Sequence, residues 1–127
     1  MTISKKQIAK KPYDLEERTF QFAKDVRMFV KTLKRTIATI EDSKQVVKAS
    51  GSVGANYIEA NESFSKKDFV FRAKICRKEA KESAYWLRLI KETNELLNHE
   101  EVIDLIQEAT ELKKIFSSMI EKTKLAK

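Results

Sequence analysis

The chain has 127 residues, of which 42% are hydrophobic and 35% are charged, and its formal net charge is +7. This length suits one domain with a core of its own, and this composition argues against disorder. With only 2 Gly and 1 Pro, the chain lacks the turn residues that sheets and hairpins need. We therefore expect an all-α protein, in which residues 14–127 form a single antiparallel up-down-up-down four-helix bundle.

The composition also constrains the compartment. The single cysteine, Cys76, cannot form an intramolecular disulfide, so nothing indicates an oxidising environment. No apolar run approaches the length of a membrane span, and residues 1–12 lack the apolar segment of a signal peptide. We expect a cytoplasmic protein with no membrane association. Residues 1–13, with four lysines and no acid, are expected to form a flexible basic tail.

The first predicted helix begins after Asp14, a residue type favoured at N-caps. Glu16 and Glu17 follow in the first turn, where the helix dipole favours acids. Its apolar positions recur every three or four residues, which keeps them on one side of a helix. These positions are Leu15, Thr19, Phe22, Val26, Phe29 and Leu33.

The second predicted helix contains a run of small residues, Ser50 to Ala55, that includes both glycines. A glycine inside a helix costs about 1 kcal/mol relative to alanine. The apolar spacing keeps its phase across this run, so we expect one continuous helix that a neighbour can approach closely. Its buried positions are predicted to be Val46, Ser50, Val53, Tyr57, Ala60 and Phe64.

Two similar start signals predict the last two helices. Ser65 followed by Asp68, and Asn98 followed by Glu101, resemble the capping box that opens many helices. The third helix is predicted to bury Phe69, Ala73, Cys76, Ala80, Ser83, Leu87, Ile90, Asn94 and Leu97. The fourth is predicted to bury Val102, Leu105, Ala109, Leu112, Phe116 and Met119.

Residues for catalysis are few. His99 is the only histidine, so a histidine-based triad or metal cluster has no second member. Cys76 falls on a predicted buried seam, where a thiol is usually inert. The run Gly51-Ser-Val-Gly54 lacks the Gly-Lys-Ser/Thr ending of a phosphate-binding loop. We expect no enzymatic activity, no cofactor and no metal site.

The third helix concentrates positive charge, since residues 65–97 carry nine basic and five acidic side chains. At about 100° per residue, five of the basic residues fall within a narrow sector opposite the predicted buried seam. They form either an ordinary solvated face or a ridge that follows a phosphate backbone. These candidate nucleic-acid-binding residues are Lys67, Lys74, Lys78, Lys81 and Arg88.

The same helix carries large apolar residues away from its main seam. Trp86 is nearest to the seam and is compatible with the core. The others either stack on bases or face another subunit, and self-association is the commoner use of such a surface. The candidate oligomer-interface residues are Phe71, Ile75, Tyr85 and Leu89.

Two motifs resemble a known family. They are Ser52-Val-Gly-Ala-Asn-Tyr-Ile-Glu-Ala60 with Ser65-Lys-Lys-Asp-Phe69, and Lys78-Glu-Ala-Lys-Glu-Ser-Ala-Tyr-Trp-Leu-Arg-Leu89. In this order and spacing they resemble the proteins encoded by intervening sequences in bacterial 23S ribosomal RNA genes, also called S23 ribosomal proteins. The segment Asp14-Leu-Glu-Glu-Arg-Thr-Phe20 is similar to that family's opening segment. The match covers about Tyr13 to Leu97, and Gly51 departs from it, since a bulkier helix former is expected there.

The resemblance implies a four-helix bundle that commonly forms a ring-like homopentamer in the bacterial cytoplasm. It also implies kinship with the accessory protein of diversity-generating retroelements, which partners a reverse transcriptase and nucleic acid. It implies no established biochemical role, because the family's own function is poorly defined.

Polar residues within these motifs are spaced to interact. Asn56 and Glu59 lie one turn apart on the second predicted helix, and Glu79 and Glu82 lie one turn apart on the third. We expect these four to form a structural polar motif, in which Asn56, Glu59 and Glu79, together with Tyr85, make interhelical hydrogen bonds that fix register.

The sequence therefore predicts a non-enzymatic, homo-oligomeric helical bundle that binds nucleic acid through basic helix surfaces. Structured RNA is the expected ligand. The alternative is an assembly or accessory scaffold whose ligand is another protein, such as a reverse transcriptase.

Overall fold

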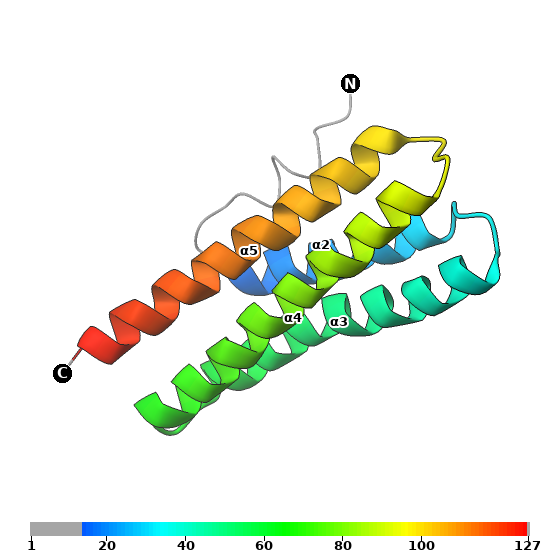
Figure 1. Ribbon diagram of the computed structural model, residues 1–127. Helices are drawn as coiled ribbons and strands as arrows, with labels where there is room; N and C mark the ends of the chain where they lie inside the picture. Colours follow the sequence, from blue (N-terminus) through cyan, green and yellow to red (C-terminus); the bar gives the residue numbers. More distant parts are fainter. Residues whose placement is uncertain (1–13, 127) are drawn as a thin grey trace.

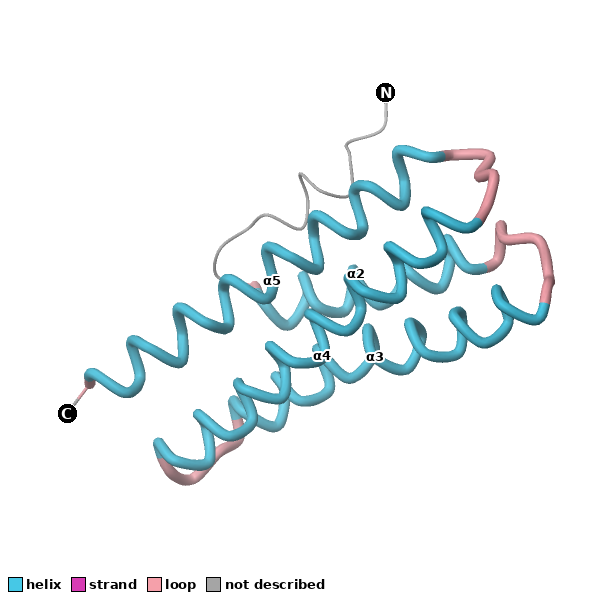
Figure 2. The backbone as a smooth tube through the Cα atoms, in the orientation of Figure 1, coloured by secondary structure: helices cyan, strands magenta, loops and turns pink. Residues whose placement is uncertain are grey.

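The computed structural model describes residues 14–126, and in this range it contains four helices and no strand. They are α2 (Leu15–Val30), α3 (Ile37–Asn61), α4 (Lys66–Thr93) and α5 (His99–Leu125). Consecutive helices run in opposite directions and are joined by short loops (Figures 1 and 2). The main contacts join α2 to α3, α3 to α4, α4 to α5, and α5 back to α2. The predicted all-α bundle is confirmed, whereas the predicted basic tail lies outside the described residues.

Each helix begins at a residue whose side-chain oxygen accepts a hydrogen bond from the backbone N–H three residues later. Asp14, Ser65 and Asn98 cap α2, α4 and α5, as predicted. Thr36 caps α3 and was not predicted; with Thr39 it forms a reciprocal box, because its backbone N–H donates to the Thr39 hydroxyl at 2.8 Å. These bonds satisfy backbone donors that have no partner within the helix.

The predicted seams meet in one hydrophobic core that draws on all four helices. Two predicted core residues are wrong: Phe64 is 104% exposed and Leu97 is 97% exposed. The 3.6-residue rhythm reaches both positions, but α3 ends at Asn61 and α4 ends at Thr93, so both side chains lie in loops. The residue buried at the end of α5 is Ile120, while the predicted Met119 is half-buried beside it.

The two glycines of α3 have different neighbours on α2. A Cβ built on Gly54 would lie 3.0 Å from Oγ1 of Thr19, which is fully buried and bonded to the carbonyls of its own helix. A Cβ on Gly51 would instead lie 3.1 Å from Nη2 of Arg27, the end of an exposed and flexible side chain. The close approach predicted for the small-residue run is therefore required at Gly54.

Arg18 on α2 forms ion pairs with two glutamates on α5, which the sequence did not predict. The Arg18 guanidinium donates from Nε and Nη2 to the two carboxylate oxygens of Glu108, at 2.8 Å and 2.7 Å, and from Nη2 to Glu111 at 3.0 Å. The hydrogen bond with Glu108 is the main cause that raises the pKa of Arg18, which therefore stays cationic. Only 9% of the Arg18 side chain is exposed. Removing one member of a buried ion pair typically costs about 3–5 kcal/mol.

The two glycines should respond differently to an added side chain. We expect Gly51→Ala to stabilise the fold by up to about 1 kcal/mol, because alanine favours the helix and Arg27 can move aside. We expect Gly54→Val to destabilise it by about 1–3 kcal/mol, because buried Thr19 cannot yield without repacking. Urea unfolding followed by circular dichroism measures both, and equal responses would contradict the assigned close approach.

Candidate nucleic-acid interface

The five predicted basic residues all lie exposed on α4. The opposite face of this helix is buried against α3 and α5, which fixes the direction of the charged side chains. Four of the five recur every seven residues, and seven residues make nearly two helical turns, so they form a row about 30 Å long. This row consists of Lys67, Lys74, Lys81 and Arg88.

A second row lies directly beside the first, and it holds the aromatic candidates. Phe71, Lys78 and Tyr85 also recur every seven residues, and the two rings are 58% and 57% exposed. The fifth predicted basic residue therefore stands between two exposed aromatic rings. We call the two rows together, Lys67, Phe71, Lys74, Lys78, Lys81, Tyr85 and Arg88, the α4 stripe. The five residues predicted for nucleic-acid binding thus share one surface with Phe71 and Tyr85, two of the four residues predicted for an oligomer interface.

The remaining apolar candidates of α4 are less exposed. Ile75 and Leu89 are half-buried. Trp86 packs against the core, and its ring meets that of Tyr85 edge to face, with the centroids 5.1 Å apart. Of the apolar candidates, only Phe71 and Tyr85 therefore present most of their surface to solvent.

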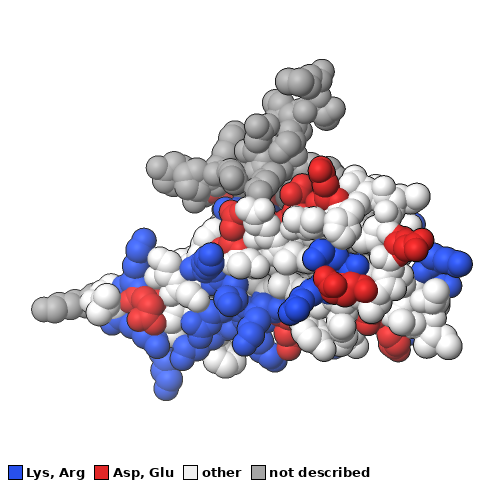
Figure 3. All heavy atoms as spheres, turned by 45° about the horizontal axis from the view of Figure 1, so that its top comes forward, with Lys and Arg blue, Asp and Glu red and all other residues white. Residues whose placement is uncertain are grey.

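Additional lysines on α5 extend the basic surface and were missed by sequence reasoning. α5 runs antiparallel to α4, and the Lys66 ammonium donates to the backbone carbonyl of Ala126, so the end of α5 lies beside the start of α4. Figure 3 shows lysine and arginine side chains gathered at this end of the molecule. The net charge of segment 98–127 did not reveal these lysines, because acidic residues in the first half of the segment cancel their charge. The lysines in its second half include Lys113, Lys114, Lys122 and Lys124.

Acidic residues border the α4 stripe. Glu82 is exposed between Lys78 and Tyr85 in sequence, and Glu79 is half-buried. Partial burial raises the pKa of the Glu79 carboxyl, and the charge of Glu82 and a hydrogen bond shared with it raise that pKa further. This pair lies at the edge of the stripe towards α3, where Lys48 is one of the neighbouring charges.

The predicted polar motif is realised only at Asn56. Its side-chain oxygen accepts a hydrogen bond from Nη1 of Arg72 on α4 at 3.3 Å, while its amide donates to the Ser52 carbonyl at 2.9 Å. The expectation was wrong for Glu59 and Tyr85, which are exposed and form no interhelical hydrogen bond with the described residues. Glu79 shares its hydrogen bond with Glu82 on the same helix. The i, i+3 spacing places the two members of each pair on one helix but does not indicate whether either of them reaches a neighbouring helix.

The residues considered for catalysis lie apart from each other. His99 is exposed at the start of α5, and no three His, Cys, Asp or Glu residues within 14–126 form a group that could hold a metal ion. Cys76 is fully buried, and its thiol donates to the Val53 carbonyl at 3.4 Å. None of the helices in this range is long and apolar enough to cross a membrane.

Burial raises the pKa of the Cys76 thiol to about 12, so it is protonated at ordinary pH. We expect the folded protein to react with a thiol reagent at pH 8 only through unfolding, because the thiolate is the nucleophile. The rate of alkylation by iodoacetamide, measured with and without urea, tests this. Rapid reaction of the native protein would contradict the burial of Cys76.

Comparisons with known proteins identify the family of the chain and a similar fold. The family model described as 23S rRNA-intervening sequence protein matches residues 11–118. A crystal structure of a protein with unknown function from the S23 ribosomal protein family of Bacteroides thetaiotaomicron is similar, with a TM-score of 0.72 and 31% sequence identity. The similarity covers 83% of this chain and 96% of that chain. No curated protein matches the chain. The family match spans most of the sequence, and the chain therefore belongs to the 23S rRNA-intervening sequence protein family.

Proposed function

We propose that this protein binds nucleic acid, with structured RNA as the preferred ligand, along the α4 stripe. One observation carries the proposal: two adjacent exposed rows on α4 combine five basic side chains with two aromatic rings, Phe71 and Tyr85. Lysine and arginine attract phosphates and release their counterions. Exposed rings offer surfaces on which unpaired bases stack. The family description refers to sequences within 23S rRNA, which makes RNA the first ligand to test.

The proposed activity is binding without catalysis, by a cytoplasmic homo-oligomer. A homopentamer is the form that the family resemblance implies. Several copies of the α4 stripe in one assembly would hold one RNA at several points, which raises the overall affinity without new contacts. The lysines at the end of α5 widen the basic surface and favour a ligand broader than a single strand.

The second candidate is an assembly or accessory scaffold whose ligand is a protein, such as a reverse transcriptase. The observation that favours it is the exposure of Phe71 and Tyr85 beside half-buried Ile75 and Leu89. Aromatic residues of this kind are enriched at the centres of protein interfaces. In that case these four residues face another subunit or partner, and the lysines serve solubility or attract an acidic surface.

Charge reversal on the α4 stripe distinguishes the two candidates. When binding releases counterions, log K falls linearly as the logarithm of the salt concentration rises. The slope is about 0.7 per contacted phosphate for single strands and about 0.9 for duplexes. We expect Lys74→Glu, Lys78→Glu and Lys81→Glu together to flatten this slope by about two units or more. Fluorescence anisotropy with labelled RNA and DNA at several salt concentrations gives the slope.

A matched control reverses three other exposed basic residues, Lys24, Arg27 and Lys31, on α2 and its C-cap. Both variants undergo the same change in net charge, so they separate a local surface from a general attraction. We expect the control to retain most of the slope. Equal losses in the two variants, or no binding by the wild type at low salt, would refute the α4 stripe as the ligand site.

Removing the rings tests the stacking contribution. We expect Phe71→Ala and Tyr85→Ala each to weaken binding of single-stranded RNA by about 1–3 kcal/mol without changing the salt slope, because no charge is lost. Light scattering on the same samples reports the oligomeric mass. Unchanged RNA affinity together with a reduced mass would favour the protein-interface alternative.

A further inference from the structure

One arginine of α4 lies at the edge of the α4 stripe and is oriented by a hydrogen bond. Arg72 is half-buried, and its Nη1 donates to the side-chain oxygen of Asn56 on α3 at 3.3 Å. Asn56 is itself oriented, because its amide donates to the Ser52 carbonyl at 2.9 Å. The Nε and Nη2 atoms of Arg72 form no hydrogen bond with the residues that the structure describes. One end of the guanidinium is therefore held, and the other edge is free.

The free edge of Arg72 lies beside an exposed aromatic ring. The Arg72 Cζ atom is 6.0 Å from the centre of the Phe71 ring. A cation–π contact reaches out to about 6 Å, so the guanidinium lies at the limit of this contact. Phe71 remains 58% exposed, and its ring is open to a ligand. The two side chains thus present a stacking surface next to a pair of hydrogen-bond donors.

This combination suits an unpaired guanine. The Nε–H and Nη2–H groups of an arginine form a fork that matches two neighbouring acceptors. A base that stacks on Phe71 can turn one edge towards this fork. Guanine offers two acceptors there, O6 and N7, whereas adenine replaces one of them with an amino donor and pyrimidines have no N7. A phosphate or a carboxylate would engage the fork without using the ring.

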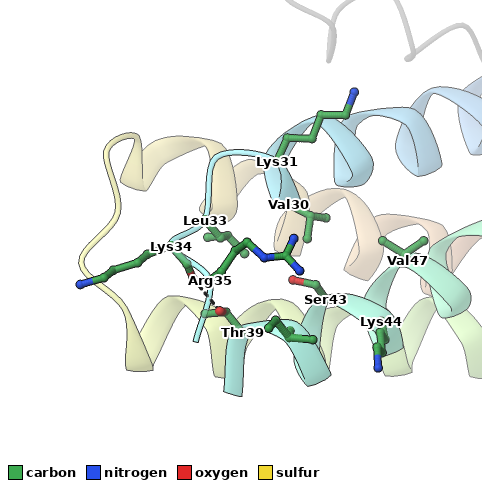
Figure 4. A pocket seen from close by; sticks show the side chains of 10 residues that line it. Val30, Lys31, Leu33, Lys34, Arg35, Thr39, Ser43, Lys44 and Val47 are labelled. Carbon is green, nitrogen blue, oxygen red and sulfur yellow. Dashed lines mark hydrogen bonds between the residues drawn. The ribbon is translucent and has the colours of Figure 1, made fainter. Parts of the chain in front are cut away.

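Two other arginines lack one of these features each. The guanidinium of Arg18 donates from Nε and Nη2 to Glu108, so its fork is occupied. Figure 4 shows the Arg35 side chain reaching towards Ser43 across a hollow between α2 and α3. No aromatic residue lines this hollow, so a base would find no ring on which to stack. Arg72 combines a free fork with an exposed ring.

We propose that Phe71 and Arg72 bind an unpaired guanine of the RNA. The base stacks on Phe71, and Nε and Nη2 of Arg72 donate to its N7 and O6 atoms. Asn56 is a positioning residue, which orients Arg72 without touching the base. This inference rests on the proposed binding of RNA along the α4 stripe. The lysines of the stripe attract phosphates of any sequence, whereas the guanine contact selects where along an RNA the protein binds.

RNA hairpins that share one stem and differ at one loop position test this preference. The loop consists of uridines with guanine, adenine or uracil at its centre, and fluorescence anisotropy at low salt gives each affinity. We expect the guanine hairpin to bind at least about fivefold tighter than the other two. A hairpin with 7-deazaguanine, which lacks the N7 acceptor, should lose most of this preference. A hairpin with hypoxanthine, which keeps O6 and N7, should retain it.

Three variants assign the preference to Arg72. Arg72→Lys keeps the charge but removes the fork, so we expect the guanine preference to disappear while the salt slope of binding stays as in the wild type. Asn56→Ala should reduce the preference, because the guanidinium is no longer oriented. Arg77→Lys is the matched control, since Arg77 is also half-buried on α4 but lies about 140° round the helix from Arg72. It should keep the full preference, and circular dichroism confirms that every variant is folded.

The outcomes separate this inference from the proposed function. Equal affinity for the three hairpins would overturn the guanine site and leave RNA binding intact, whereas no binding to any hairpin at low salt would overturn both. If Arg72→Lys weakened all hairpins by one factor and kept the preference, Arg72 would contact a phosphate and the guanine site would be wrong. A preference that survives 7-deazaguanine, or that is lost equally in Arg77→Lys, would also overturn it.

Discussion

The hydrogen-bonded ion pair of Arg18 with Glu108 and Glu111 is the interaction that closes the bundle. α2, with 16 residues, is the shortest of the four helices in residues 14–126, and it makes its other main contact with α3. The guanidinium of Arg18 joins it to the last helix through three hydrogen bonds of 2.7–3.0 Å. With α2 held between α3 and α5, the four seams enclose one core and leave α4 its solvent-exposed face.

The packing of α4 against its two neighbours determines which of its surfaces is available to a ligand. α4 contacts α3 on one side and α5 on the other, so its buried face is occupied along its length. Small residues, including Ala73, Cys76 and Ala80, fill that face and allow both neighbours to pack on it. The charged and aromatic residues of the α4 stripe are confined to the outside. The two long rows that carry the proposed function therefore follow from the packing of the core.

Much of this architecture could be predicted from the sequence, because apolar spacing and capping residues act locally. The predicted caps at Asp14, Ser65 and Asn98 were confirmed, and the seam rhythm identified most of the core. The same rhythm failed at Phe64 and Leu97, since a period cannot reveal where a helix stops. Arg18 was missed because its partners lie 90 and 93 residues away, and nothing local indicates which charged residue becomes buried. Only the structure shows that the basic candidates and two aromatic candidates form one surface, because this conclusion requires the exposure of each side chain. The spacing of the residues does not give that exposure.

Photocrosslinking to RNA that contains 4-thiouridine tests the central claim most directly, because it identifies the residues in contact with the ligand. Purified protein is irradiated with the RNA, digested, and the crosslinked peptides are identified by mass spectrometry. The proposed function predicts crosslinks concentrated in α4 at Phe71, Tyr85 and the lysines between them, with further crosslinks near the end of α5. Crosslinks confined to α2 and α3, or none at low salt, would contradict it.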